Sequence, residues 1–307
     1  MKNTLVYSTL KYSEMANKIN KKIKAKLGNL ERKHFPDGER YLKINDNLIN
    51  KHIILVGGTV SESDTLEVYD LACAFSKYGA RKITLVIPYF GYSTMERAIN
   101  QGEVVPAKTR ARLLSSIPRP AEGISVLLLD LHSEGIPYYF EGNMNVFHLY
   151  SKPILLKEIR KISKNFILAS TDAGRAKWVE SLARDLKVKP AFAYKKRISG
   201  SDTEVTGVNA DVKNKDVIIY DDMIRTGSSL IKAAEAYKKS GAKNIYAITT
   251  HGVFPEGSIE KLNKSIIKKV ICSNSHPNHA RLEKNVFDIS DIFSDFILKN
   301  QDHQESH

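Results

Sequence analysis

The stretch VIIYDDMIRTGSS, residues 217–229, carries the strongest structural signal in the sequence. An apolar run ends in two adjacent carboxylates, Asp221 and Asp222, and continues into a turn of Thr, Gly and Ser. A buried strand that passes through such a turn into a helix is the βα unit of a parallel sheet. The strand-end carboxylates can accept hydrogen bonds from sugar hydroxyls, and the backbone N–H groups that open the helix can bind a phosphate. The segment therefore predicts a sugar-phosphate site on an α/β fold.

A plain helix start is the alternative interpretation of the same residues. Thr and Ser are common N-cap residues, and acids beside them can simply be solvated. Two acids at the end of a buried strand repel each other, however, unless a ligand or a cation lies beside them. We therefore expect a ligand site here.

Further βα units recur along the chain. Leu, Val and Ala lie at helical spacing from Ser61 to Lys77 and from Ser229 to Lys239, and Gly79 and Gly241 follow as C-cap signals. Seven short apolar runs are typical of buried strands, at residues 52–58, 82–90, 124–132, 165–171, 216–222, 244–252 and 268–275. The alternation predicts mainly parallel sheets flanked by helices.

Two phrases, KYGARKITLV (77–86) and KSGAKNIYAI (239–248), repeat the same order of helix end, Gly-Ala and strand. They indicate two related halves, although Gly-Ala junctions before strands are common in any α/β protein, so duplication and coincidence both stay open. We expect an N-terminal domain at residues 1–147, a C-terminal domain at 148–295 and a polar tail at 296–307.

The composition indicates which kinds of ligand the protein can bind and where in the cell it is expected. In 307 residues, 47 Lys and Arg exceed 34 Asp and Glu, and the net charge of +13 favours anionic ligands. Cys73 and Cys272 are too few for a disulfide framework or a zinc cluster, so we expect a cytoplasmic protein. We expect no secretory signal, and no apolar run approaches the roughly 20 residues of a membrane helix. Basic residues are not interleaved with aromatic ones, so neither a nucleic acid nor a membrane is an expected partner.

The segment 217–229 resembles the phosphoribosyl-diphosphate-binding loop of the type I phosphoribosyltransferase fold. Matching phrases from FPDGER (35–40) to THGVF (250–254) extend the resemblance over most of the chain, to the ribose-phosphate diphosphokinase (phosphoribosyl-diphosphate synthetase) family. The resemblance implies two similar phosphoribosyltransferase-type domains in a homo-oligomer whose active site is shared between subunits. It also implies that the enzyme uses Mg2+ to transfer the diphosphoryl group of ATP to the C1 hydroxyl of ribose 5-phosphate. The products would be AMP and 5-phosphoribosyl 1-diphosphate, for nucleotide biosynthesis.

The motifs of the family assign a role to each matching position of this sequence. Catalytic cations are implied at Lys195 and Arg197. ATP contacts are implied from Phe35, Asp37, Glu39, Glu96, Arg97 and His132, of which the first three serve a neighbouring subunit. A magnesium site is implied at Asp130, His132 and Glu141. The ribose 5-phosphate site would consist of Asp172, Asp221, Asp222, Arg225, Thr226, Gly227, Ser228 and Ser229.

The chain departs from the family pattern within several of these motifs. Thr94 and Met95 stand where an Arg-Gln pair contacts ATP, and Arg175 stands where the family has the second Gly of an Asp-Ala-Gly-Gly turn. Arg225 and Asn145 each replace an acid. The departures keep two alternatives open: a catalytically silent regulatory subunit of the same fold, and a phosphoribosyltransferase, which shares only the sugar-phosphate loop. Retention of the catalytic cations favours an active enzyme.

Overall fold

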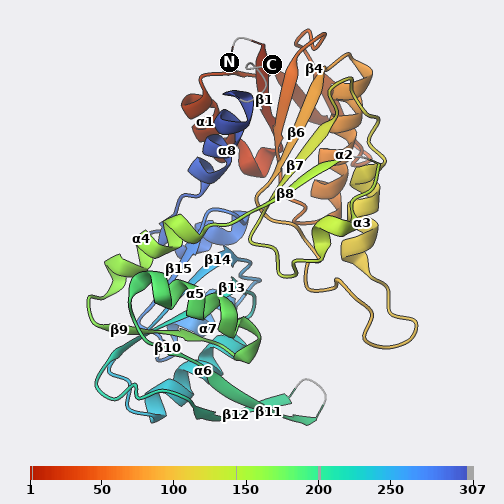
Figure 1. Ribbon diagram of the computed structural model, residues 1–307. Helices are drawn as coiled ribbons and strands as arrows, with labels where there is room; N and C mark the ends of the chain where they lie inside the picture. The colour runs from red at the N-terminus through yellow and green to blue at the C-terminus, as the bar shows by residue number, and fades with distance from the viewer. Residues whose placement is uncertain (2, 143, 200–201, 303–307) are drawn as a thin grey trace. The chain divides into compact units, whose positions relative to one another are not determined.

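The computed structural model describes residues 1, 3–142, 144–199 and 202–302, with the backbone alone at 173, 194–199, 202–206 and 301–302. The chain forms two compact units (Figure 1). The first consists of Met1–Tyr150 and Ser290–His307, and the second of Ser151–Ile289. Each contains a six-stranded parallel sheet together with helices, which confirms the expected fold class. Among the described helices, none is long and apolar enough to cross a lipid bilayer.

Six parallel strands form the sheet of the first unit. From one edge to the other they are β2 (Lys26–Leu27), β1 (Thr4–Ser8), β5 (His52–Val56), β6 (Lys82–Ile87), β7 (Ile124–Leu129) and β8 (Asn145–Leu149). Its helices are α1 (Ser13–Ile23), α2 (Glu62–Lys77), α3 (Pro106–Ser115) and α8 (Ser290–Asp302), with short 3-10 turns η1 (Leu10–Tyr12) and η2 (Ile136–Tyr139). Helices α1 and α8 lie on one face of the sheet, and α2 and α3 lie on the other (Figure 1). Because both faces are covered, the central strands are mostly apolar, and Ile53, Leu85 and Val126 are fully buried.

The second unit repeats this topology strand for strand. Its sheet contains, in order, β10 (Pro190–Ala191), β9 (Phe166–Ser170), β13 (Asp216–Ile224), β14 (Ile245–Gly252), β15 (Lys269–Ser273) and β16 (Val286–Phe287). Its helices are α4 (Lys152–Ile162), α5 (Ala176–Leu186), α6 (Ser228–Lys239) and α7 (Ser258–Asn263), with 3-10 turns η3 (Ala173–Arg175) and η4 (Pro277–Leu282). Each strand number exceeds that of its counterpart in the first sheet by eight. The strand order therefore supports the two related halves that the repeated phrase indicated.

Each unit also carries a two-stranded antiparallel hairpin at the same place in its strand sequence. In the first unit β3 (Leu30–His34) pairs with β4 (Arg40–Ile44), and in the second β11 (Ala193–Ser199) pairs with β12 (Asp202–Val208). The buried carboxylate of Glu67 in α2 fixes the first hairpin, because it pairs with Arg32 at 3.3 Å and with Arg40 at 3.2 Å. The FPDGER motif forms the tip of this hairpin, as its turn residues predicted.

The repeated Gly-Ala phrase has the same backbone geometry in both units. Gly79 follows α2 with φ 88°, and Gly241 follows α6 with φ 93°. The next residue donates its N–H back into the helix each time, from Ala80 to the Phe75 carbonyl at 3.0 Å and from Ala242 to the Tyr237 carbonyl at 3.1 Å. A left-handed Gly with this reverse hydrogen bond is the usual end of a helix that turns into a strand.

The C-terminal segment differs from the polar tail expected at residues 296–307. Residues up to 302 belong to α8, which is part of the first unit. Lys22 of α1 pairs with Asp295 of α8 at 2.7 Å, and the ring of Phe296 lies 4.8 Å from that of Phe147 in β8. Phe293 and Ile297 lie one turn apart on α8 and are both buried, so this part of the segment belongs to the core and not to a tail.

Candidate active site

The acidic pair of the second unit lies where β13 extends past its neighbour β9. The last paired residues of these strands are Tyr220 and Ser170, so Asp221 and Asp222 stand beyond the end of β9. Asp222 is only 3% exposed. Its backbone N–H donates to Asp221 Oδ1 at 3.0 Å, and the Thr171 hydroxyl donates to Asp221 Oδ2 at 2.8 Å. Burial, and then the neighbouring charge of Asp222, raise the pKa of Asp221 well above its usual range.

A guanidinium group completes this pair. Nη2 of Arg175 lies 2.5 Å from Asp222 Oδ2. Arg175 ends η3, just before α5, so the cation comes from the turn that follows β9. The sequence identified Arg175 only as a departure from a family Gly, because its partner Asp222 lies in a different βα unit.

Asp172 belongs to the same turn. Its Oδ1 accepts the N–H of Gly174 at 2.9 Å, and its carbonyl accepts the hydroxyl of Ser170 at 2.6 Å. These bonds fix the turn between β9 and η3. Because β9 and β13 are parallel neighbours, the structure brings Asp172 to the same sheet edge as the acidic pair.

The turn after β13 has the geometry of a phosphate-binding loop. Gly227 has φ 76°, and α6 begins at the next residue. A Cβ added at Gly227 would lie 2.7 Å from Leu262 Cδ2, so only glycine fits there without displacement. The hydroxyls of Thr226 and Ser228 lie 3.1 Å apart at this helix start. The predicted loop members, Arg225, Thr226, Gly227, Ser228 and Ser229, therefore occupy one turn at the N-terminus of a 12-residue helix.

Lys261 is a candidate functional residue that the sequence did not reveal. Its Nζ donates to Ser228 Oγ at 2.7 Å, which places an ammonium group at the phosphate loop. The lysine comes from α7, which carries no motif in the sequence. Only the packing of α7 on the loop reveals it.

In the first unit, the predicted Asp130 and His132 follow the carboxyl end of β7. Asp130 is 5% exposed and has φ 38°, a conformation that residues other than glycine rarely adopt. His148 of β8 accepts the N–H of Leu131 at Nε2, 2.9 Å away, and its Nδ1 lies 3.1 Å from Glu134 Oε2. Because a backbone N–H can only donate, the imidazole proton is on Nδ1. His148 therefore holds this segment in place, a role the sequence missed because β8 was not predicted as a strand.

The chemistry of Asp130 and His132 suits a hard cation. A carboxylate and a few further ligands are sufficient for Mg2+, which keeps several waters and binds substrate phosphates directly. Burial, followed by the hydrogen bond to Glu134 and the nearby charges of Glu134 and Asp130, raises the pKa of Tyr150 to about 12. Glu141 pairs instead with Arg112 at 2.8 Å. No three acidic, His or Cys side chains of the described residues form a metal cluster, and the magnesium site at Asp130, His132 and Glu141 stays a prediction.

The remaining ATP residues of the first unit lie near its surface. Phe35 is 51% exposed at the hairpin tip, where Asp37 Oδ1 accepts the N–H of Glu39 at 3.0 Å. Glu96 and Arg97 are neighbours whose side chains lie 3.5 Å apart, with Arg97 76% exposed. The contact of Phe35 with the ATP of another subunit stays a prediction.

Lys195 and Arg197 lie on β11 of the second hairpin. Their backbones pair with Val205 and Thr203 of β12. Their side chains are outside the described residues, so the catalytic assignment stays a prediction.

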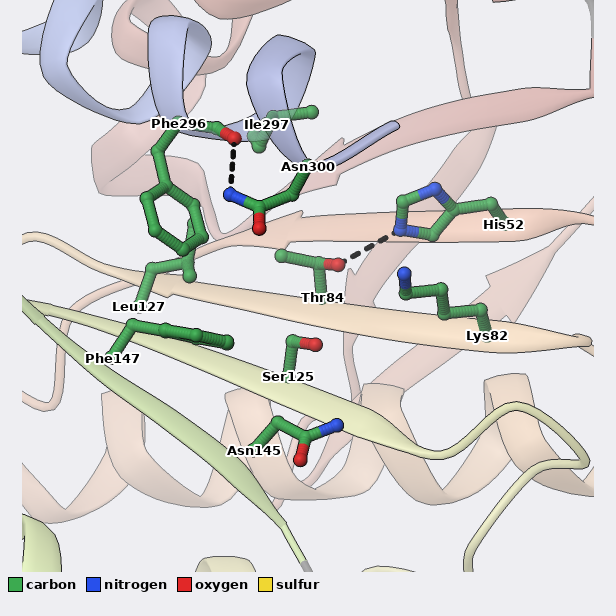
Figure 2. A pocket seen from close by; sticks show the side chains of 10 residues that line it. All are labelled: His52, Lys82, Thr84, Ser125, Leu127, Asn145, Phe147, Phe296, Ile297 and Asn300. Atoms are coloured by element: carbon green, nitrogen blue, oxygen red, sulfur yellow. Dashed lines mark hydrogen bonds between the residues drawn. The ribbon is translucent and has the colours of Figure 1, made fainter. Parts of the chain in front are cut away.

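A separate cavity of about 200 Å³ lies in the first unit, between the sheet and α8 (Figure 2). Thr84, Ser125 and Asn145 line it as a row across three strands in register, and Phe296, Ile297 and Asn300 of α8 line it from the other side. His52 joins the row through a 2.8 Å contact between Nε2 and Thr84 Oγ1. These residues are at or near the amino ends of parallel strands, so the cavity is not part of the carboxyl-end sites above.

Comparison with known proteins assigns the chain to a family. Residues 4–117 match the model of the N-terminal domain of ribose phosphate pyrophosphokinase, and residues 164–306 match that of the phosphoribosyl synthetase-associated domain. The ribose-phosphate pyrophosphokinase of Porphyromonas gingivalis is 30% identical over 307 residues, which cover 98% of this chain and 96% of that protein. The chain belongs to the ribose-phosphate pyrophosphokinase family. This is the family that the motifs predicted, because ribose-phosphate diphosphokinase is another name for it.

Further ribose-phosphate pyrophosphokinases agree with the assignment. The protein of Pyrococcus furiosus is 35% identical over 247 residues, covering 80% of this chain and 85% of its own. The crystal structure of phosphoribosylpyrophosphate synthetase from Mycobacterium smegmatis matches with a TM-score of 0.86 at 22% identity, over 98% of this chain and 99% of that one. That likeness shows the fold. Ribose-phosphate pyrophosphokinases generally need a metal ion.

Proposed function

We propose that this chain is an active ribose-phosphate pyrophosphokinase of the cytoplasm, which uses ATP, ribose 5-phosphate and Mg2+. One observation carries the proposal. The Asp221–Asp222 pair and the phosphate loop that opens α6 lie on a single βα turn. A ligand that fits both the acidic pair and the phosphate loop must carry adjacent hydroxyls at a short distance from a phosphate. Ribose 5-phosphate has that pattern.

The residues of the second unit bind and orient the sugar. Asp221 and Asp222 accept the ribose hydroxyls, with Asp172 beside them, and the loop from Thr226 to Ser229 holds the 5-phosphate. The C1 hydroxyl oxygen attacks the β-phosphorus of ATP, and the bond from that phosphorus to the oxygen bridging to the α-phosphate breaks. AMP leaves with the bonding electrons, and the hydroxyl proton is released. Fixing both reactants in this geometry supplies much of the rate enhancement.

The residues of the first unit and the second hairpin act on ATP. Asp130 and His132 would hold Mg2+, which neutralises phosphate charge when bound. Lys195 and Arg197 stabilise the negative charge that develops on the transferred group. The ATP contacts are completed by Glu96 and Arg97 and, from a neighbouring subunit, by Phe35, Asp37 and Glu39. The proposal therefore includes a homo-oligomer with a shared active site.

Phosphorus NMR tests the proposal directly. The purified chain is incubated with Mg2+, ribose 5-phosphate and either ATP, GTP or CTP, and the expected result is 5-phosphoribosyl 1-diphosphate with ATP. Absence of product with every nucleotide would support the silent regulatory subunit instead. A parallel incubation of 5-phosphoribosyl 1-diphosphate with free nucleobases tests the phosphoribosyltransferase alternative, for which we expect no turnover.

A further inference from the structure

The charge balance of the acidic pair leads to an inference that rests on the proposed ribose 5-phosphate site. Asp221 and Asp222 are consecutive residues, and Asp222 is almost fully buried. Two carboxylates this close resist carrying two negative charges, and a protonated carboxyl is a poorer acceptor for a sugar hydroxyl. The pair therefore needs a compensating positive charge before the sugar binds.

Arg175 supplies that charge from within the chain. Its guanidinium lies 2.5 Å from Asp222 Oδ2, and its side chain is 21% exposed. Charge-assisted hydrogen bonds of this kind are short, strong and directional. The turn that presents the arginine is itself fixed, because Asp172 accepts the N–H of Gly174 and the hydroxyl of Ser170.

We propose that Arg175 is a positioning residue for the sugar: it keeps Asp222 ionised and oriented, so that the acidic pair accepts ribose hydroxyls without a divalent cation between the two carboxylates. A carboxylate offers about four lone-pair positions, so the ion pair and a hydroxyl can share it. The glycine of the family pattern cannot do this, because it has no side chain. The arginine at this position therefore changes how the site is neutralised while the acidic pair itself is kept.

Calorimetric titration with ribose 5-phosphate separates this role from catalysis. Binding is measured for the unaltered chain and for Arg175→Ala, each in EDTA and in excess Mg2+. We expect the unaltered chain to bind ribose 5-phosphate equally well in both buffers, within about twofold. In EDTA, Arg175→Ala should bind it about tenfold more weakly than the unaltered chain does, because the variant lacks one charge-assisted hydrogen bond. Added methylguanidinium or Mg2+ should restore part of the affinity of the variant.

Two further variants, a matched control and a conservative substitution, complete the test. Arg184→Ala removes an exposed arginine from α5, the helix that begins directly after Arg175, and should bind like the unaltered chain. Arg175→Lys keeps the charge without the planar fork and should bind with intermediate affinity, which gives a result even if Arg175→Ala fails to fold by circular dichroism.

The possible failures are distinguishable. The inference would be overturned if Arg175→Ala bound ribose 5-phosphate in EDTA as tightly as the unaltered chain, or more tightly. It would also be overturned if the unaltered chain and the variant needed Mg2+ equally for binding. Absence of binding by the unaltered chain in both buffers would instead overturn the proposed function.

Discussion

The ammonium group of Lys261 lies beside the Ser228 hydroxyl at the first turn of α6. A phosphate bound at this helix N-terminus would gain a charge-assisted hydrogen bond from it. We expect Lys261→Met to raise the ribose 5-phosphate concentration needed for half-maximal rate about tenfold, which corresponds to about 1.4 kcal/mol, with little change in kcat. Steady-state kinetics at saturating ATP measures both quantities.

Lys264→Met is the matched control for this prediction. Lys264 lies one turn further along and pairs with Glu260 at 2.6 Å, so its loss should leave the sugar requirement unchanged. Equal effects of the two variants would remove Lys261 from the phosphate site.

Lys195 is one of the residues that we propose to act in the transition state. Because its proposed role is to neutralise charge that develops during transfer, we expect Lys195→Ala to lower kcat about 100-fold and to change the dissociation constant of ribose 5-phosphate by less than about threefold. Rapid-quench kinetics and calorimetry give the two values. Lys189→Ala, which removes an exposed lysine, controls for the change in net charge. Parallel losses in rate and binding would contradict the transition-state role.

Without the family resemblance, the residues themselves indicated a site only where its members are contiguous. The acidic pair and the loop after it could be recognised because one strand, one turn and one helix start hold all of them. The contacts of Arg175 with Asp222 and of Lys261 with Ser228 could not, because each joins segments that only the folded sheet brings together. The sequence shows a charged side chain but not the residue with which it pairs in the folded protein.

Among the secondary-structure elements, burial decided what was predictable. The seven predicted apolar runs all contain strands of the two sheets, because central parallel strands are covered on both faces. The hairpin β3–β4 was not predicted as two strands, since LERKH and RYLKI are rich in charged residues and contain no fully buried one. Among the described residues of this hairpin, only Leu30, Leu42 and Ile44 pack against the core, and so few apolar residues do not make a strand signal.

The same hairpin gives a prediction about subunits. If Phe35 at its tip serves the ATP of a neighbouring subunit, Phe35→Ala and Lys195→Ala damage different parts of a shared site. Mixing the two inactive variants should then regenerate some intact sites and recover activity, measured after subunit exchange. Recovery should be absent when either variant is mixed with itself. No recovery in the mixture, despite subunit exchange seen by mass spectrometry, would contradict a shared site.

The stability of the whole molecule should depend on pH through His52. Burial, reinforced by the charges of Lys82 and Arg81, lowers the pKa of His52 to about 3. An unfolded chain binds this proton near pH 6.5, so the stabilisation is complete above that pH and is lost as the pH falls toward 3. Between about pH 7 and about pH 5 we expect this residue to remove up to about 2 kcal/mol from the free energy of unfolding.

Urea unfolding at the two pH values, for the unaltered chain and for His52→Gln, measures this contribution. Glutamine can keep a hydrogen bond to Thr84 but cannot titrate, so the variant should lose less stability on acidification. Identical pH dependence in both chains would show that other groups are responsible.

The place of α8 has a consequence for synthesis on the ribosome. Residues 1–150 of the first unit precede the second unit in the chain, yet α8, which shares one face of the first sheet with α1, is translated only after the whole second unit. Residues 151–289 can therefore fold as an inserted unit before α8 packs on the N-terminal sheet. A stop codon that removes α8 would consequently expose part of the apolar sheet face in the half that carries Asp130 and His132, and would leave the half that carries Asp221 and Asp222 intact.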